Sequence, residues 1–405
     1  MVTYPKDWDE AKLLDHMSLV QGLTYTPENV KQTGTLVLRS SNIQNGRLSL
    51  EDNVYVNARV PEEKMVVQGD ILVCVRNGSS ALIGKSCVLP ELKCTTFGAF
   101  MSVLRGDTTG YFAKLFESNI VQEQVRGRSN ATINQITKKD FQSILVTVPE
   151  KPEQEEIART LSLFDTYIDD LAELIEKKKD IRDGALEDLM SRRTRMREFH
   201  TDWVVYPFSE YFSLLPTNTC SREQLSDKGK VGDIHYGDVL VKYSNVLSNA
   251  DEIPRLKDAS RINERSYLQM HDVLIADTAE DETIGKVVQV GKVTIPLVGG
   301  LHTVACRPKY KTAEGFLGYY MNSSLYHDQL FPYITGIKVA SISKKSFLET
   351  ELCIPVDIEE QKAIVSVLTV MDEEIRDLET EREKIIKIRE GAMDDLLTGR
   401  IRLTK

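Results

Sequence analysis

The residues most suggestive of chemistry are Gly84-Lys85-Ser86, which match the end of a phosphate-binding loop. Such a loop holds phosphates with its backbone N–H groups, and it needs another glycine five residues before the Gly-Lys pair. That position is Ser79 here, and Gly78 lies one residue too far away. A similar segment later in the chain, Gly285-Lys286-Val287, lacks the hydroxyl that would bind Mg²⁺. We therefore interpret both segments as β-turns with an exposed lysine and predict no nucleotide site.

Other catalytic patterns are incomplete. Ser341-Ile342-Ser343-Lys344 matches S-x-x-K, but no other motif of the serine enzymes that use it accompanies it. The sequence has no H-E-x-x-H, no G-x-S-x-G and no G-x-G-x-x-G after a strand. Its six cysteines form no C-x-x-C pair, and its six histidines do not cluster with them. We predict no catalytic residue and no metal site, and hence a protein that acts by binding.

The composition narrows the possible classes of protein further. The chain has 405 residues, 41% of them hydrophobic and 28% charged, which is typical of a globular protein with two or three domains. No apolar run is long enough to span a membrane, and the N-terminal residues lack the apolar core of a signal peptide, so we expect a cytoplasmic protein. The net charge of −10 argues mildly against nucleic acid. Residues 150–199 and 356–405 each carry −4, however, which leaves only −2 for the remainder.

The chain contains an internal repeat. Residues 154–196 align without a gap on residues 361–403, and 17 of the 43 positions are identical. Shorter matches precede them in the same order, among them Trp8 with Trp203 and Ile83-Gly84-Lys85 with Ile284-Gly285-Lys286. Each half is therefore a divergent domain followed by a similar helix. This pattern predicts two modules of one architecture with two different ligands.

The strongly repeated segments show a heptad seam, which predicts long helices that pair with each other. At 1.5 Å per residue, each helix would measure roughly 60 Å. Antiparallel pairing would place the two domains at opposite ends, related by a pseudo-twofold axis. The alternative is that each helix packs on its own domain. We expect a kink or a close helix approach at Gly184 and Gly391. The seam residues that we expect to form the coiled coil and support partner binding are Ile157, Leu161, Ile168, Leu171, Ile364, Leu368, Ile375 and Leu378.

The remaining segments indicate a mixed α/β (α+β) fold. In the first domain we predict strands at 35–38, 54–56, 71–75 and 144–148 and a helix at 111–124. In the second we predict strands at 238–241, 273–275 and 287–290 and a helix at 315–330. The expected order is domain 1 (residues 1–150), a central helical arm (151–198), domain 2 (199–355) and a distal helical arm (356–405).

This arrangement resembles the specificity subunits of type I restriction–modification systems. The similarity rests on the order of domain, helix, domain and helix, and on the strand-end pattern L-R-x-x-N-I-x-x-G at residues 38–46. It also rests on G-D-I-L followed by I-G-K at 69–72 and 83–85, and on the helix entry of a proline followed by E-Q-x-x-I, seen at 149–157 and 355–364. The first helix entry is one residue shorter than the second. Domain 2 has Lys242-Tyr243-Ser244-Asn245-Val246 where domain 1 has the fuller arginine pattern.

The resemblance implies a non-catalytic subunit that binds a bipartite double-stranded DNA target, one half-site per recognition domain. It implies two modification methyltransferase subunits on the helical arms, and a motor–nuclease restriction subunit that joins the complex. S-adenosylmethionine, ATP and magnesium would be used by those partners and not by this chain.

Side chains at strand ends and in loops are our candidates for DNA contacts. Arginine pairs with guanine, asparagine and glutamine pair with adenine, and Lys, Arg, Ser and Thr bind phosphates. In domain 1 the candidates are Arg39, Ser41, Asn42, Arg76, Asn77, Ser79, Lys85, Arg126, Arg128, Asn130 and Lys138. In domain 2 they are Lys242, Tyr243, Asn245, Thr278, Lys286, His302, Lys338, Ser341 and Lys344.

Two other functions compete with DNA binding. A scaffold whose two domains bind proteins, with the helices as a spacer, is favoured slightly by the acidic net charge. An NTP-dependent enzyme is disfavoured by the broken phosphate loop.

Overall fold

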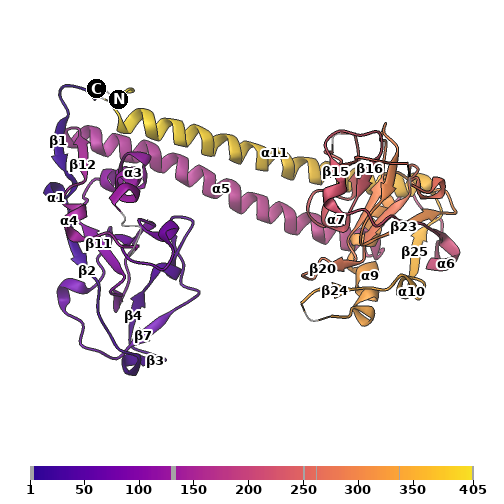
Figure 1. Cartoon of the computed structure of the whole chain (residues 1–405), viewed down its shortest axis with the longest axis horizontal. Helices are drawn as coiled ribbons and strands as arrows, with labels where there is room; N and C mark the ends of the chain where they lie inside the picture. The colour runs from indigo at the N-terminus through magenta and orange to yellow at the C-terminus, as the bar shows by residue number, and fades with distance from the viewer. Residues whose placement is uncertain (1–3, 129–133, 250, 261, 337, 404–405) are drawn as a thin grey trace. The chain divides into compact units, whose positions relative to one another are not determined.

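The computed structural model describes residues 4–128, 134–249, 251–260, 262–336 and 338–403. They fall into two units, which are described one at a time (Figure 1). Unit 1 comprises described residues from 1–172 and 380–405, and unit 2 comprises those from 173–379. Each unit holds one mixed α/β domain together with segments of two long helices, α5 (Lys151–Met190) and α11 (Ile358–Leu397). The predicted fold class is confirmed.

Unit 1 is built on small sheets. One has the order β2–β11–β8–β9 and is antiparallel throughout; its strands are β2 (Ser18–Gln21), β8 (Ile71–Cys74), β9 (Ser86–Val88) and β11 (Met101–Arg105). The second has the order β10–β4–β7–β3, with β10 parallel to β4; its strands are β3 (Val30–Lys31), β4 (Thr35–Leu38), β7 (Val54–Val56) and β10 (Thr95–Phe97). Two antiparallel pairs are β1 (Asp9–Lys12) with β12 (Leu145–Val148) and β5 (Ile43–Gln44) with β6 (Arg47–Leu48).

Unit 2 follows a related plan. Its larger sheet has the order β14–β23–β19–β21–β17; the strands are β14 (Phe212–Leu215), β17 (Val246–Leu247), β19 (Val273–Ala276), β21 (Val287–Val290) and β23 (Thr303–Pro308). The other has the order β15–β18–β16–β22; the strands are β15 (Leu225–Ser226), β16 (Gly232–Ile234), β18 (Arg255–Leu256) and β22 (Leu297–Gly299). Two antiparallel pairs are β13 (Trp203–Pro207) with β25 (Glu351–Pro355) and β20 (Thr278–Ala279) with β24 (Ala340–Ser341).

Short helices cover these sheets. Those of unit 1 are α1 (Leu13–His16), α2 (Tyr111–Glu117), α3 (Asn119–Arg128) and α4 (Lys138–Phe141), with 3₁₀ turns η1 (Pro27–Asn29), η2 (Ser40–Asn42), η3 (Glu62–Lys64) and η4 (Ser80–Leu82). Those of unit 2 are α6 (Phe208–Tyr211), α7 (Tyr236–Val241), α8 (Phe316–Asn322), α9 (Ser324–His327) and α10 (Lys344–Phe347), with η5 (Arg222–Gln224), η6 (Glu264–Ser266) and η7 (Asp328–Tyr333).

The central strand of each unit joins two hydrophobic cores. In β8, Ile71 and Val73 belong to one core, and Leu72 belongs to the other. The same alternation recurs along β19 in unit 2. Because successive side chains of a strand point to opposite faces, a run that is apolar throughout is buried on both sides. This explains why the predicted strands 71–75 and 273–275 are borne out as β8 and β19.

The long helices pair antiparallel within each unit. In unit 2, Lys178 of α5 binds Glu374 of α11 at 2.6 Å, and Arg182, one turn further along α5, binds the earlier Asp372 at 3.4 Å. In unit 1, Arg389 of α11 binds Asp165 of α5 at 2.5 Å. Ile168 and Leu378 are half-buried, and the other six predicted seam residues are buried. Antiparallel pairing is therefore confirmed within each unit, whereas the pseudo-twofold axis stays a prediction.

Each helix also enters the core of a domain, so the alternative arrangement is partly correct. In unit 1 the buried core includes Ile157 and Leu161 from α5 and Met393, Leu396 and Leu397 from α11. The repeat-equivalent residues of unit 2 do the same: Ile364 and Leu368 from α11, and Leu186, Leu189 and Met190 from α5. Since burying a large aliphatic side chain contributes about 1.5–3 kcal/mol, these contacts anchor both helices to each domain.

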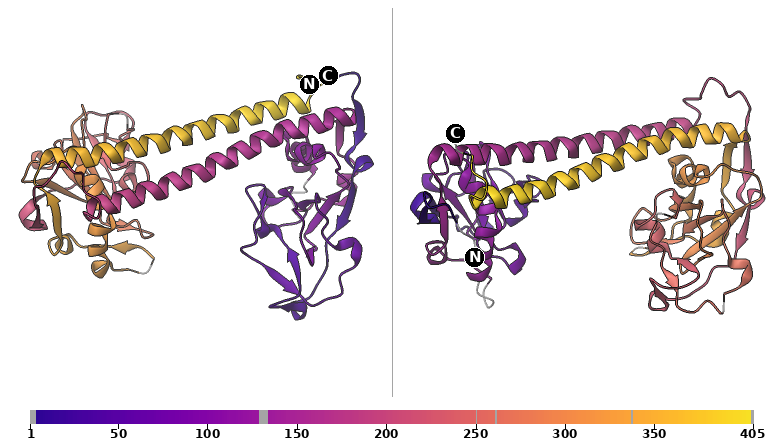
Figure 2. Two further views of the ribbon diagram at one scale, coloured as in Figure 1. Left: turned by 180° about the vertical axis from the view of Figure 1, so that it is seen from behind. Right: turned by 90° about the horizontal axis from the view of Figure 1, so that it is seen from above.

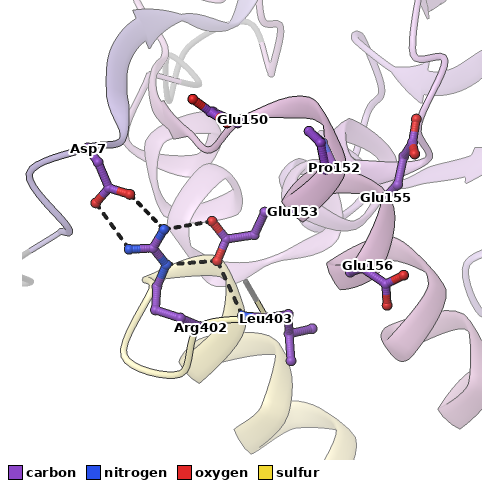
Figure 3. A pocket seen from close by; sticks show the side chains of 8 residues that line it. All are labelled: Asp7, Glu150, Pro152, Glu153, Glu155, Glu156, Arg402 and Leu403. Carbon is purple, nitrogen blue, oxygen red and sulfur yellow. Dashed lines mark hydrogen bonds and ion pairs between the residues drawn. The ribbon is translucent and has the colours of Figure 1, made fainter. Parts of the chain in front are cut away.

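A buried Trp–Glu–Arg cluster occurs once in each unit. In the Trp8 cluster, the indole N–H of Trp8 donates to Glu153 at 3.3 Å. The Arg402 guanidinium binds Glu153 at 2.7 and 2.9 Å and also binds Asp7 (Figure 3). Burial alone would raise the pKa of Glu153, but Arg402 outweighs it and holds that pKa below its ordinary value. The cluster therefore ties the segment after α11 to the start of α5.

The Trp203 cluster of unit 2 repeats this geometry. The indole N–H of Trp203 donates to Glu360 at 3.1 Å, and Arg195 binds Glu360 at 2.8 and 2.9 Å. Arg192 also lies over the Trp203 ring, 5.7 Å from its centre. The repeat thus extends to buried polar groups, which need partners wherever they occur.

Four sequence predictions about secondary structure are wrong. The segment 238–241, predicted as a strand, lies in helix α7, because Asp238 at the third helical position accepts from the backbone N–H of His235. The predicted helix 111–124 is broken at Ser118, which is extended. The predicted helix 315–330 is broken at Ser323 in the same way. Finally, the close helix approach expected at Gly184 and Gly391 is wrong, because a Cβ built at either position meets no neighbouring atom within 4 Å. Both α5 and α11 are continuous helices (Figure 2), and a kink at the two glycines stays a prediction.

Candidate nucleic-acid interface

Several domain 1 candidates converge on the segment after β8. The Asn77 side chain donates to Ser40 Oγ at 3.1 Å and accepts from the backbone N–H of Ser79. Arg76 forms a backbone bridge to Gln135, in the segment before α4. Three separated stretches of chain therefore meet here: the end of β4, the end of β8 and the approach to α4. Asn130 lies outside the described residues.

An open cleft of about 730 Å³ lies beside this segment, and Arg39, Ser41, Tyr25, Asp52 and Phe100 are among the residues that line it. Arg39 binds Asp52 through Nη2 at 2.7 Å, but its Nε is buried without a hydrogen-bond partner among the described residues. Ser41 Oγ is also buried and unpartnered there. An unsatisfied buried polar atom costs about 1–3 kcal/mol, so both side chains are held beside this cleft at a cost in stability.

Other domain 1 candidates have internal roles. Asn42 is fully buried; its side chain accepts from the backbone N–H of Arg39 and donates to two backbone carbonyls. Arg128 donates to the backbone oxygens of Gln124 and Ser143. Buried or occupied side chains do not reach base edges, so these contacts speak against direct DNA contacts by Asn42 and Arg128.

The remaining domain 1 candidates lie away from the cleft lining. Lys85 is half-buried in a turn after Gly84, whose φ of +84° allows close packing on α3. The turn agrees with the sequence prediction, but the lysine is less exposed than expected. Arg126 and Lys138 are exposed.

The equivalent place in domain 2 also gathers candidates. Thr278 of β20 is paired with Ser341 of β24, and its hydroxyl lies 3.2 Å from His302 Nδ1. Lys338 is exposed in the turn that leads to β24. Lys344 is exposed at the start of α10, with Nζ 3.3 Å from the Thr217 hydroxyl. The buried Thr278 and the exposed His302 thus lie together where β19 ends and β23 begins.

Four domain 2 candidates are engaged elsewhere. Tyr243 is 2% exposed, and its hydroxyl donates to a backbone oxygen at 3.1 Å. Lys286 donates to the Leu240 backbone oxygen at 2.8 Å, and burial lowers its pKa. Asn245 accepts from an asparagine side chain at 2.8 Å. Lys242 is exposed but lies 3.4 Å from the buried Asp238. For Tyr243 and Lys286 in particular, burial favours a structural role over DNA contact.

Sequence reasoning missed Phe100. Its ring is 58% exposed at the rim of the domain 1 cleft, with the Arg76 guanidinium 5.2 Å from the ring centre. A signal was present, because Gly98-Ala99-Phe100 lies just before β11 as Gly300-Leu301-His302 lies just before β23. An alignment of that part of the repeat would have found it.

A second open pocket, of about 520 Å³, is acidic. Glu150, Glu153, Glu155 and Glu156 line it beside Arg402 (Figure 3). Carboxylates repel phosphates, and Arg402 is already bound to Asp7 and Glu153, so this pocket does not suit a DNA backbone. Among the described residues, we find no group of three or more His, Cys, Asp or Glu side chains placed to hold a metal ion. None of the described helices is long and apolar enough to cross a membrane.

Comparison with known proteins now identifies the family. The model of the type I restriction modification DNA specificity domain matches residues 5–180 and 201–388. The type I restriction enzyme EcoKI specificity subunit of Escherichia coli K12 is 30% identical over 292 residues, which cover 67% of this chain but only 61% of that subunit. The MjaVIII specificity subunit of Methanocaldococcus jannaschii is 21% identical over 432 residues, covering 98% and 94% of the two chains.

A solved structure agrees at the level of the fold. The S subunit of a type I restriction–modification system from M. genitalium superposes with a TM-score of 0.55 at 15% identity, over 96% of both chains. The family model matches both halves of the sequence, each of which includes a domain and most of a long helix. This chain therefore belongs to the family of type I restriction modification DNA specificity domains.

Proposed function

We propose that this chain reads a bipartite double-stranded DNA target, with one half-site for each domain. The observation that carries the proposal is that equivalent strand ends in the two domains expose side chains of different chemistry, Arg76 and Phe100 in domain 1 and His302 in domain 2. Two domains of one architecture with different exposed side chains suit two different base sequences. The family of the chain supports this role.

We further propose that two modification methyltransferase subunits bind the helices, one at each unit. Unit 1 exposes Leu163 of α5 and Ile388 of α11, at 59% and 44%. Unit 2 exposes the repeat-equivalent residues, Val370 of α11 and Ile181 of α5, at 62% and 58%. Apolar side chains outside the seam gain nothing from helix pairing, and their repetition provides two similar docking positions.

The chemistry would belong to the partners. We propose that S-adenosylmethionine is bound by the methyltransferase subunits, and that ATP and magnesium are bound by restriction motor–nuclease subunits that join the complex. This chain would supply recognition and positioning only. Since the proposed ligand is cellular DNA, we infer that the chain works in the cytoplasm.

The decisive experiment for the function is co-expression with the methyltransferase encoded beside it, followed by sequencing of methylated bases. We expect adenine methylation at a two-part motif with a fixed spacer. Replacing domain 1 by the corresponding domain of another family member should change one half of the motif only. An assembled complex that methylates no DNA would contradict the proposal and favour a protein-binding scaffold.

Partner docking has its own test. Leu163→Asp with Ile388→Asp should reduce the number of bound methyltransferase subunits from two to one, measured by size-exclusion chromatography with light scattering. The control is Val67→Asp, at a 50% exposed position of domain 1 away from the helices. Two bound subunits in the double variant would exclude this surface.

A further inference from the structure

Strand register gives an equivalence between the two domains that the sequence alone left weak. In unit 1, Met101 of β11 lies opposite Cys74 of β8. In unit 2, Thr303 of β23 lies opposite Ala276 of β19. Counting from these pairs, Arg76 corresponds to Thr278, and Phe100 corresponds to His302.

The other end of the same strand pairs carries identical buried groups in both units. Asp70 binds Arg105 through both carboxylate oxygens, at 2.8 and 2.7 Å. Asp272 binds Arg307 in the same way, at 2.9 and 2.7 Å. Both aspartates are 1% exposed. The architecture therefore keeps its internal charges at that end of the strand pair.

At the opposite end of these strands, the corresponding residues differ completely. In domain 1, Arg76 lies over the Phe100 ring, and the Arg76 backbone N–H donates to the Phe100 oxygen at 3.1 Å. In domain 2, the hydroxyl of the buried Thr278 contacts the His302 ring, and the His302 side chain is 49% exposed. A lone exposed ring would need no explanation. A pair held at the same place in both units, with different chemistry in each, points to ligand selection.

The surroundings of the domain 1 pair fit this role. Phe100 lines the same cleft as Arg39 and Ser41, which carry the buried unpartnered Nε and Oγ atoms. Among the described residues, no carboxylate is recorded within ion-pair distance of Arg76, so its guanidinium is free to bind an external acceptor. Arginine binds guanine O6 and N7 with two hydrogen bonds, and an aromatic ring makes apolar contact with a thymine methyl group.

We propose that Arg76 and Phe100 determine base preference at adjacent positions of the half-site read by domain 1. Arg76 reads a guanine, and Phe100 contacts the neighbouring base pair. In domain 2, His302 occupies the place equivalent to Phe100 and reads a different base there, with the buried Thr278 positioning its ring. This inference rests on the proposed function, because it assigns residues to the reading of the two half-sites.

The test uses the full chain assembled with its methyltransferase and a DNA library randomised in both half-sites. The wild-type complex is measured first, and the absence of any methylated motif would count against the proposed function itself. Given a wild-type motif, Arg76→Lys should lower the preference for guanine at one position of one half-site by about 5- to 150-fold, as expected for loss of a bidentate contact. Phe100→Ala should relax the adjacent position.

Controls separate base reading from simple loss of affinity. The second half-site is an internal control in every experiment, and Arg59→Lys changes another exposed arginine of domain 1. Thermal unfolding coincident with wild type shows that a variant is folded, and Arg76→Lys keeps both the charge and the aliphatic stem. Unchanged preferences, or a loss that is equal for all four bases at every position, would overturn the proposal.

Discussion

Units 1 and 2 agree where side chains are buried and differ where they are exposed. The Trp8 and Trp203 clusters, built on Glu153 and Glu360, have the same hydrogen bonds. The exposed Arg76 and Phe100 of domain 1 and the exposed His302 of domain 2 share only their place on the strands. A buried carboxylate constrains its neighbours because it must be paired, whereas an exposed side chain is free to change. The comparison therefore separates the residues that maintain the architecture from those available for recognition.

The largest expected effect is the removal of a buried glutamate from a cluster. Glu153→Ala would remove the acceptor of the Trp8 indole N–H and leave Arg402 paired with Asp7 alone. Glu360→Ala would remove the acceptor of the Trp203 indole N–H and the ion-pair partner of Arg195. Breaking a buried ion pair from one side costs about 3–5 kcal/mol. We expect each change to destabilise its own unit by a similar amount, measured by denaturant unfolding.

Neighbouring glutamates provide matched controls. Glu155 and Glu359 are exposed near the same helix starts, and alanine there should change stability by less than about 0.5 kcal/mol. Loss of stability from Glu153→Ala but not from Glu360→Ala would show that the two clusters are not energetically equivalent.

Much of the architecture followed from sequence, because periodicity and repetition report burial directly. The heptad seam predicted α5 and α11, and the apolar runs predicted β8 and β19. Local hydrogen bonding was harder to foresee. Asp238 turns an apolar segment that was predicted as a strand into a short helix by capping it. An apolar run of four residues carries too little periodicity to distinguish the two.

The candidate site was less predictable than the fold. Residue type alone favoured Asn42 and Arg128, but backbone groups in their own domain already occupy both side chains. Phe100 was overlooked because the candidates were chosen among polar residue types. The exposure of this apolar side chain is visible only in the structure. Which polar side chains face outward depends on loop conformation, and loop conformation is set by these same tertiary contacts.

A second, smaller effect concerns the ion pairs between the helices. Asp165 is bound by Arg389 and Lys114, whereas the repeat-equivalent Asp372 is bound by Arg182 and the Tyr319 hydroxyl. We expect Asp165→Asn to cost about 2 kcal/mol at neutral pH, and Asp372→Asn to cost less because one partner is a neutral phenol. Denaturant unfolding at pH 7 measures both. An equal loss in the two variants would contradict this difference.

The free energy of unfolding at acid pH provides a further check on Asp165. Burial raises its pKa, but Lys114 and Arg389 outweigh burial and leave that pKa below the ordinary value. The folded chain therefore binds this proton less readily than the unfolded chain does. The stabilisation is full above about pH 4 and is lost as the pH falls below it. Asp165→Asn should reduce the loss of stability on acidification, whereas Asp170→Asn, at an exposed position, should not.

The smallest expected effect has the opposite sign. Gly184 and Gly391 occupy equivalent interior positions of α5 and α11, and an added Cβ would meet no atom within 4 Å at either one. Alanine is favoured over glycine in a helix by up to about 1 kcal/mol, so Gly184→Ala and Gly391→Ala should each stabilise the chain by about 0.5–1 kcal/mol. Gly318→Ala in α8 is the contrasting control, because its Cβ would lie 2.0 Å from the Asn245 backbone oxygen and should destabilise unit 2. If both helix variants stabilise and their effects add, glycine is not required by helix packing at these repeated positions. Destabilisation by either would instead show a close approach or a bend that the repeat preserves in both helices.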